Sequence, residues 1–257
     1  MAERLDQIPG NIRGFFLLFC GMRKMSLLTL LLLIAACSKK EEKGNLHITG
    51  NINGLKSGTL YIEAVRDTTL MPLDTIKISG NSAFESHLNI ESPEMLYLIL
   101  DRGATSSGDD KLMFFAEPGK INIESNLKAF YADARITGSK NHELYEQYRK
   151  VKNRFISEEL DLTEKKLNAF RDKKQFDEAQ NQAALESILK RKYLYAINFA
   201  LNNKNHEIAP YIALSEIKDA NLKYLDTICK SLSPDVAKSK YGKTLSAYIE
   251  ERKNHGY

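Results

Sequence analysis

The fold is decided by residues 46–64, LHITGNINGLKSGTLYIEA, in which apolar side chains alternate with polar ones. This alternation predicts two half-buried strands, because successive side chains of a strand point to opposite faces. Gly54 and Ser57-Gly58 separate the two strands, and Gly50-Asn51 is expected to end the first one. We therefore expect the N-terminal half of the chain to be a β-structure.

The two-residue period continues to about residue 138, and turn signals stand at Gly80-Asn81 and Pro118-Gly119. Residues 95–100 are continuously apolar and predict a strand that is buried on both faces. Further strands are expected around Ile76 and Ile78, Phe84 to Ile90 with Ser86 on the apolar face, residues 112–116, Ile121 and Ile123, and Ala134 and Ile136. Seven or eight short strands predict a β-sandwich or a strongly curled sheet.

Residues 141–253 change to the helical period. The expected helices lie at residues 144–155, 160–170, 176–201 (the longest), 211–217 and 222 onward, with a last one that begins at Ser233-Pro234-Asp235 and runs through Ile249. The predicted fold class is therefore α+β, an N-terminal antiparallel β-sandwich-like module (residues 45–139) followed by an all-helical segment (residues 140–257).

The sequence before the strands carries a bacterial lipoprotein signal. Residues 22–37, MRKMSLLTLLLLIAAC, join two cations to a short apolar run and the lipobox Ile34-Ala35-Ala36-Cys37. The apolar run is about 10 residues long, whereas a membrane-spanning helix needs roughly 20. We expect cleavage between Ala36 and Cys37 and lipidation of Cys37. A chance Ala-Ala-Cys behind an ordinary secretory signal is the alternative.

The signal divides the N-terminal region. Residues 1–21 are interpreted as an upstream start that precedes the true one, residues 22–36 as the signal peptide, and residues 37–44 as the lipidated cysteine and its tether. Lys40-Glu41-Glu42 resembles the export signal of surface lipoproteins in Bacteroidetes, and it is equally typical of a solvated spacer. The expected location is the cell envelope, with the lipid anchor in the outer membrane and the protein on its periplasmic or surface face.

Charge and cysteine content limit the function. Four of the 37 basic and two of the 33 acidic residues precede Cys37, so the remaining chain is nearly neutral and gives no reason to expect a nucleic-acid partner. Cys20 also precedes the lipid site, which leaves Cys229 as the one thiol and excludes an intrachain disulfide. Cys229 is interpreted as a small core residue, because neither a resolving cysteine nor a neighbouring base accompanies it.

Other motifs are better explained by structure than by chemistry. Residues 237–244, AKSKYGKT, match a loose phosphate-binding loop but follow a helix start and hold one glycine. His142-Glu143 begins like a zinc-protease helix, but Glu146 occupies the position of the second histidine. Glu117 stands before Pro118-Gly119, a turn between two strands. The remaining histidines show no paired spacing and are expected at the surface or in loops: His47, His87, His206 and His255. We predict no catalytic residue, metal or cofactor.

These motifs and their order resemble a domain of unknown function at the N-terminus of Bacteroidetes lipoproteins of the thiol:disulfide interchange or AhpC/TSA type. The resemblance covers roughly residues 45–253. It rests on I-x-G-x-I-x-G-L at residues 48–55, Leu60-Tyr61-Ile62, Asp74-Thr75 with residues 80–84, FFAEPG at residues 114–119 and ITGSKN at residues 136–141. Longer relatives continue into a thioredoxin domain with CxxC, which has no counterpart here, so the resemblance implies no redox activity.

Three functions remain open. The first is a non-catalytic envelope lipoprotein that binds a protein partner or an envelope ligand, for example through residues 101–111, and that is attached to the membrane through Cys37. The second is a partner in trans of a separate thioredoxin-like enzyme. The third is a truncated thiol:disulfide interchange enzyme, which sequence beyond the codon of Tyr257 would reveal. We expect the first and do not expect an enzyme.

Overall fold

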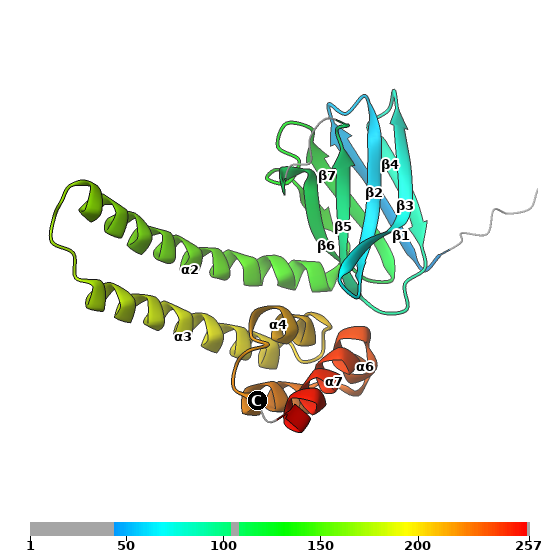
Figure 1. The fold of residues 1–257 in the computed structure, drawn as a ribbon. Coiled ribbons are helices and arrows are strands. Elements are labelled where there is room, and N and C mark those ends of the chain that lie inside the picture. The colour runs from blue at the N-terminus through cyan, green and yellow to red at the C-terminus, as the bar shows by residue number, and fades with distance from the viewer. Residues whose placement is uncertain (1–43, 104–107, 256–257) are drawn as a thin grey trace, which may run out of the picture. The chain divides into compact units, whose positions relative to one another are not determined.

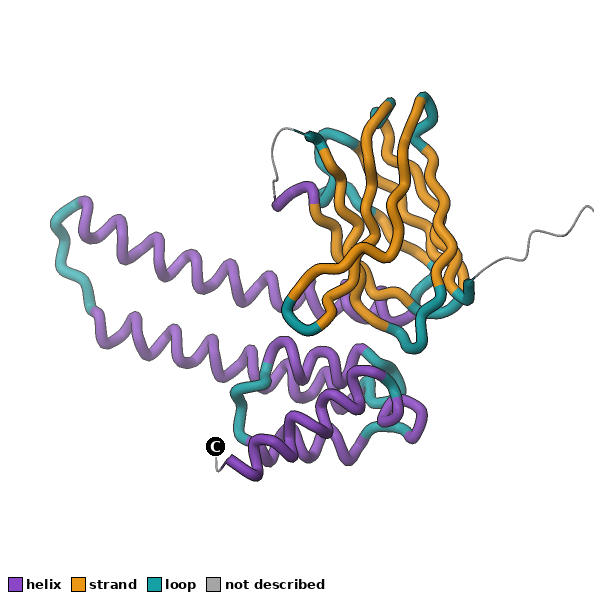
Figure 2. The backbone as a smooth tube through the Cα atoms, turned by 45° about the vertical axis from the view of Figure 1, so that its right-hand side comes forward, coloured by secondary structure: helices purple, strands orange, loops and turns teal. Residues whose placement is uncertain are grey.

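The computed structural model describes residues 44–103 and 108–255, and the lipoprotein signal with Cys37 lies outside them. Two four-stranded sheets form the N-terminal part (Figures 1 and 2). The strands are β1 (Leu46–Asn53), β2 (Ser57–Arg66), β3 (Thr69–Ser79), β4 (Ala83–Leu88), β5 (Glu94–Asp101), β6 (Lys111–Ala116), β7 (Gly119–Asn126) and β8 (Arg135–Thr137), with a short 3₁₀ turn, η1 (Gly108–Asp110), before β6.

The strand order is β4-β1-β7-β8 in one sheet and β3-β2-β5-β6 in the other. The chain changes sheets more than once, and after β6 it returns to the sheet that contains β1. After this return β7 runs parallel to β1, whereas every other described pair is antiparallel. The predicted α+β class is confirmed, and the parallel pair is a feature that the sequence did not predict.

The sandwich core lies between the two sheets. The buried side chains of β1 (Leu46, Ile48 and Ile52) alternate with half-exposed ones, as the period predicts. Each fully buried Leu or Ile contributes about 1.5–3 kcal/mol relative to an exposed one. The expectation that Gly50-Asn51 ends the strand is wrong, because β1 continues through it. A Cβ atom at Gly50 would overlap the Ile123 carbonyl oxygen and the Phe84 ring, so this glycine permits close packing within the sheet.

The apolar run of residues 95–100 has two partners. Leu96, Leu98 and Leu100 belong to the sandwich core, whereas Met95 points to the other side and joins the helical cluster together with Phe115 of β6. Near its start, β5 is therefore covered on both faces, as predicted. Further along the strand, Tyr97 and Ile99 are only half-buried.

The C-terminal part consists of helices. They are α2 (Lys140–Arg171), α3 (Glu178–Asn202), α4 (Ile208–Glu216), α5 (Leu222–Ser231), α6 (Pro234–Lys238) and α7 (Lys240–His255). The prediction of separate helices at 144–155 and 160–170 is wrong: α2 is continuous and longer than α3. It contains neither Gly nor Pro, so nothing in it breaks the backbone hydrogen-bond ladder. The α2 and α3 helices form an antiparallel hairpin (Figure 1).

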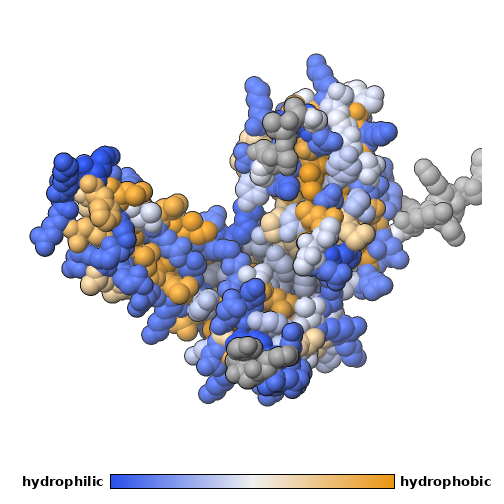
Figure 3. Space-filling model, in the orientation of Figure 1, coloured by the Kyte–Doolittle hydropathy of each residue, from blue (hydrophilic) through white to orange (hydrophobic). Residues whose placement is uncertain are grey.

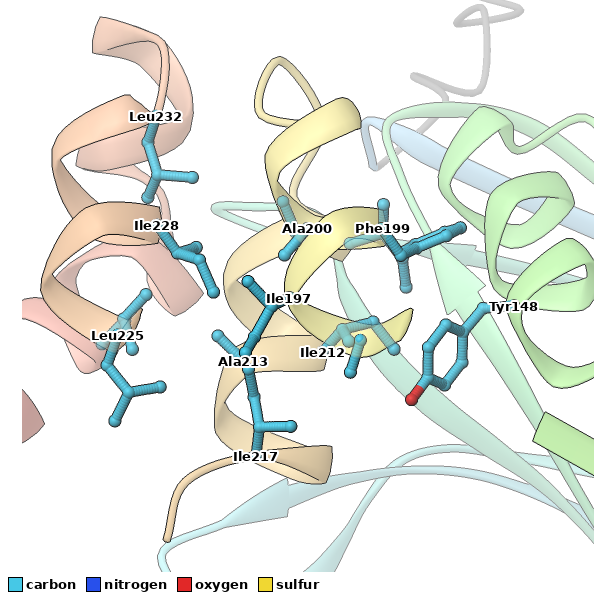
Figure 4. Packing of buried hydrophobic residues seen from close by; sticks show 14 of the residues in the cluster. Tyr148, Ile197, Phe199, Ala200, Ile212, Ala213, Ile217, Leu225, Ile228 and Leu232 are labelled. Atoms are coloured by element: carbon cyan, nitrogen blue, oxygen red, sulfur yellow. The ribbon is translucent and has the colours of Figure 1, made fainter. Parts of the chain in front are cut away.

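A second core lies among the helices (Figure 4). Ile197 and Ala200 of α3 pack with Ile212 of α4 and with Leu225 and Ile228 of α5. The predicted last helix is divided at Ser239 into α6 and α7, because Ser239 has extended backbone dihedrals.

Among the described helices, none combines the length with the apolar character that crossing a lipid bilayer requires.

Candidate functional site

Glu117 and Ser139 cap the N-terminus of α2. The Glu117 carboxylate accepts hydrogen bonds from the backbone N–H groups of Lys140 (2.6 Å) and Asn141 (3.2 Å). The Ser139 hydroxyl accepts one from the N–H of His142 at 3.0 Å. The amides at a helix start lack partners within the helix, and a negative charge is favourable there. Glu117, for which the sequence favoured a simple turn, therefore joins the sandwich to the first helix.

Asn141 extends this junction to a third element. Its side-chain amide donates to Glu117 (2.7 Å) and to Glu207 (2.9 Å), and its side-chain oxygen accepts from the N–H of Ile208 (2.8 Å). Ile208 is the first residue of α4. One buried amide thus connects the turn after β6, the start of α2 and the start of α4, and each of these bonds holds the structure together.

His142 is buried beside this junction. Its Nδ1 accepts a hydrogen bond from the Phe115 N–H at 3.3 Å, and its Nε2 lies 3.9 Å from the Glu146 carboxylate. Desolvation by burial, helped by the charge of Arg149, lowers the pKa of His142 to about 4. The imidazole is therefore neutral at physiological pH and contributes to packing between β6 and α2.

A charged cleft of about 820 Å³ lies where the start of β5 meets α6 and α7. At its base the buried carboxylate of Glu94 pairs with both terminal nitrogens of Arg66, at 2.7 and 2.9 Å, and with the Lys240 ammonium group. Residues from both halves of the chain line the cleft, including Glu91, Asp235, Lys238 and Lys243.

The ion pairs determine what Glu94 can do. Desolvation by burial acts to raise the pKa of Glu94, but hydrogen bonds from Arg66 and Lys240 outweigh it, and the pKa lies below its ordinary value. A carboxylate that stays ionised and paired with two cations is a poor general acid or base at neutral pH. The cleft offers charges of both signs and suits a polar contact better than proton transfer.

The resemblance of residues 237–244 to a phosphate-binding loop fails on geometry. The segment forms the corner between α6 and α7, and two of its amides are already bonded. The N–H of Lys240 donates to the Ser92 hydroxyl at 3.0 Å, and that of Gly242 to the Ser239 hydroxyl at 3.3 Å. A phosphate-binding loop needs several free backbone N–H groups that point into one concavity. The N–H groups of Lys240 and Gly242 are not free, because side-chain hydroxyls already accept from them.

Cys229 lies on α5, half-buried against the helical core. Desolvation by burial raises the pKa of its thiol. Because the thiolate is the reactive form, this environment suppresses the nucleophilicity of Cys229.

The structure brings together two histidines that the sequence treated as scattered. His47 on β1 and His87 on β4 are cross-strand partners, and their rings stack with centroids 4.3 Å apart. Both Nε2 atoms approach one carboxylate oxygen of Glu85, at 2.7 and 3.0 Å. Hydrogen bonds from His47 and His87 lower the pKa of Glu85. The alternation of apolar and polar residues in the sequence indicates that these side chains lie on the outer face of the sheet. Only the register of β1 against β4 shows that they lie next to each other.

The hairpin carries an apolar stripe on α2, which we define as Ile156, Leu160, Leu167 and Phe170. Leu160, Leu167 and Phe170 are 62–63% exposed, and Ile156 is 36% exposed. Spacings of 4, 7 and 3 residues place these side chains on one face of the helix. Apolar patches are visible along α2 and α3 in Figure 3. The sequence assigned this helical segment but did not indicate that these side chains face solvent.

Residues 104–107 of the expected binding loop lie outside the described residues, as does Cys37. His206 lies in the connection between α3 and α4, and His255 ends α7.

Fold and geometry define an α+β protein in which a β-sandwich is fastened to a helical segment by Glu117 and Asn141. Residues 46–145 match the family model described as Domain of unknown function (DUF4369). The matched segment contains the whole sandwich and ends in the first turns of α2, so it includes both residues of this junction. None of the curated proteins matches the chain.

Proposed function

We propose that this protein is a non-catalytic envelope lipoprotein that binds a partner protein through the apolar stripe on α2. It is anchored through a lipid on Cys37, and its location is the outer membrane. The lipobox at residues 34–37 supports the anchor. The motifs at residues 48–55 and 114–119 resemble those of Bacteroidetes lipoproteins, and they support the assignment of this chain to the lipoproteins of that group.

The observation that carries the proposed binding role is the exposure of the stripe. Three large apolar side chains that are more than 60% exposed and lie on one helix face leave a hydrophobic surface in water. Isolated surface apolar residues are ordinary, whereas a contiguous apolar surface is typical of an interaction site.

The shape of the stripe indicates a helical partner. It runs from Ile156 to Phe170, about 21 Å at the rise of an α-helix. When Thr163 is counted with the four apolar residues, successive positions are separated by 4, 3, 4 and 3 residues. This is the spacing of the seam of a coiled coil. We therefore expect the partner to contribute an amphipathic helix that packs along α2.

The environments of the candidate reactive groups support a non-catalytic role. The raised pKa of Cys229 disfavours the thiolate. His142 is used as an acceptor for Phe115, and Glu117 is used as a helix cap.

Photo-cross-linking in intact cells tests the binding role. A photoreactive amino acid replaces Leu160 or Leu167 in the full chain, and Asp161, an exposed residue about 100° around α2 from Leu160 and outside the stripe, is the matched control position. We expect one protein adduct from positions 160 and 167 and none from position 161. An adduct of twice the chain's mass would identify a second copy as the partner, and adducts with lipid alone would contradict the proposal.

Palmitate labelling tests the anchor. The wild-type chain should incorporate labelled acyl chains, and Cys37→Ala should lose the label, because the lipobox cysteine is the acceptor. Cys20→Ala serves as the control and should keep it. Label retained by Cys37→Ala would overturn the lipoprotein assignment.

A thioredoxin-like enzyme is a second candidate for the partner. The specific observation in its favour is the set of sequence motifs shared with lipoproteins that carry such a domain, including ITGSKN at residues 136–141. It predicts that the chain co-purifies with a CxxC protein, and that this association depends on Leu160 and Leu167. Repeated isolation without any CxxC protein would remove this candidate.

A further inference from the structure

Three potential metal ligands converge on the outer face of the sheet formed by β4, β1, β7 and β8. Their donor atoms, Nε2 of His47 and His87 and a carboxylate oxygen of Glu85, all lie within 4.8 Å of one another. They are the one such group of three or more among residues 44–103 and 108–255. All three side chains are accessible, with exposures of 25%, 33% and 60% for His47, His87 and Glu85.

The sheet fixes the two imidazoles in place. His47 and His87 are directly paired in the antiparallel β1–β4 ladder, and Glu85 precedes His87 by two residues and therefore shares its face. The imidazole planes are inclined by only 9°. Both Nε2 atoms thus approach the same small volume, which Glu85 borders from the side.

The composition of the group selects a class of metal. Imidazole nitrogen suits Zn²⁺, Cu²⁺ and Ni²⁺, whereas Ca²⁺ and Mg²⁺ require several oxygen ligands. Two histidines and one glutamate also form the ligand set of zinc sites that keep an open position. The other neighbour of His47 in the sheet register is Lys120 of β7, which is a cation. Within the group of three ligands the negative charge comes from Glu85, because a metal-binding imidazole is neutral.

We propose that His47, His87 and Glu85 bind one divalent transition-metal ion of the Zn²⁺ and Cu²⁺ class. The two Nε2 atoms and one Glu85 oxygen are the protein ligands, and water or an external donor completes the coordination. Glu85 now bridges the two rings, and its exposed side chain can withdraw to admit the ion. Bound metal would link the edge strand β4 to β1.

Calorimetric titration with Zn²⁺ tests this site. The full chain is used in detergent, without a polyhistidine tag and in a buffer that does not bind zinc. We expect one ion per chain and an increase in Tm with Zn²⁺ but not with Mg²⁺, because a ligand that binds the folded state stabilises it. His47→Ala and His87→Ala should each weaken binding at least about tenfold.

His206→Ala is the matched control, since this histidine lies far along the chain in the α3–α4 connection, and it should bind Zn²⁺ as the wild type does. Glu85→Gln should weaken binding while leaving the histidines intact. Zinc binding that is absent in the wild type, or unchanged in His47→Ala and His87→Ala, would overturn the proposal.

A second measurement requires no variant and is independent of folding defects. The electron paramagnetic resonance spectrum of the wild-type chain with one equivalent of Cu²⁺ should show hyperfine coupling to two imidazole nitrogens. A spectrum of aqueous Cu²⁺, or coupling to a single nitrogen, would contradict the assigned ligands.

Discussion

Glu117 illustrates how a single side chain connects the two halves of the molecule. The sequence places it at a turn, and it lies in the short connection between β6 and β7, where its carboxylate also binds the first amides of α2 and the side chain of Asn141. His142, one residue further, fits its neutral imidazole against the backbone of β6. The polar side chains at this junction attach the helical segment to the β-sandwich.

Removal of the Glu117 cap should reduce stability. Glu117→Ala leaves the N–H groups of Lys140 and Asn141 without their acceptor, which should lower the free energy of unfolding by about 1–2 kcal/mol. Glu143→Ala removes an exposed ion pair with Lys140 and a first-turn carboxylate that makes no hydrogen bond to the first amides, and it should cost less, about 0.5 kcal/mol. Urea unfolding measures both. Equal losses in the two variants would show that Glu117 does not act as the cap.

His142 should make stability depend on pH. Its pKa is about 4 in the folded chain and about 6.5 when unfolded, so the unfolded state binds more protons between these values. Stability contributed by the neutral imidazole is complete above about pH 6.5 and is lost as the pH falls to 4, by up to about 1.4 kcal/mol per pH unit.

His142→Asn isolates this effect, because its side-chain oxygen can still accept from Phe115 but does not titrate. Chemical unfolding at several pH values should give a weaker dependence between pH 4 and 6.5 in this variant than in the wild type. Curves of identical slope would exclude His142 as the titrating group.

The elements themselves were largely predictable, because their periods are properties of neighbouring residues. The alternation at residues 46–64 and the helical spacing after residue 141 correspond to strands and helices in the structure. Predictions failed where a local signal competed with packing: Gly50-Asn51 is a turn signal that lies inside β1, and Ser239 divides a helix that its apolar pattern would have continued.

Gly50 and Gly80 provide a direct comparison of the two roles of glycine. A Cβ atom at Gly50 would overlap Ile123 and Phe84, so Gly50→Ala should lower the free energy of unfolding by about 2–3 kcal/mol. Gly80 has φ +80°, and a Cβ atom there would meet no other atom within 4 Å, so Gly80→Ala should cost only the backbone strain, about 1 kcal/mol. Thermal unfolding distinguishes them, and a larger loss for Gly80→Ala would refute the packing argument.

At the scale of the whole molecule, two hydrophobic cores meet at the start of β5 and the end of β6. Met95 and Phe115 belong to the helical core although they stand on sandwich strands, and the N–H of Met95 donates to the Tyr241 hydroxyl at 2.9 Å. This connection joins residues 146 positions apart. Contacts over such separations leave no periodic trace in one sequence.

The candidate sites also depend on tertiary contacts that a single sequence does not reveal. His47 and Glu85 are 38 residues apart, and only the register of β1 against β4 brings them together. The apolar stripe on α2 was equally hidden, since an exposed Leu160 and a core-facing leucine give the same helical period. The sequence reveals which residues are apolar, but tertiary packing determines which of them are covered.

If the stripe on α2 serves binding rather than folding, the cross-linking yield at position 167 should depend on the side chain at position 160, which Leu160→Glu changes. Leu160 is 62% exposed, so the substitution should change the free energy of unfolding by no more than about 0.5 kcal/mol. We predict that the adduct at position 167 is lost in Leu160→Glu and kept in the control Asp161→Lys, with an unchanged Tm in both. Undiminished cross-linking in a folded Leu160→Glu chain would show that the stripe does not form the binding surface.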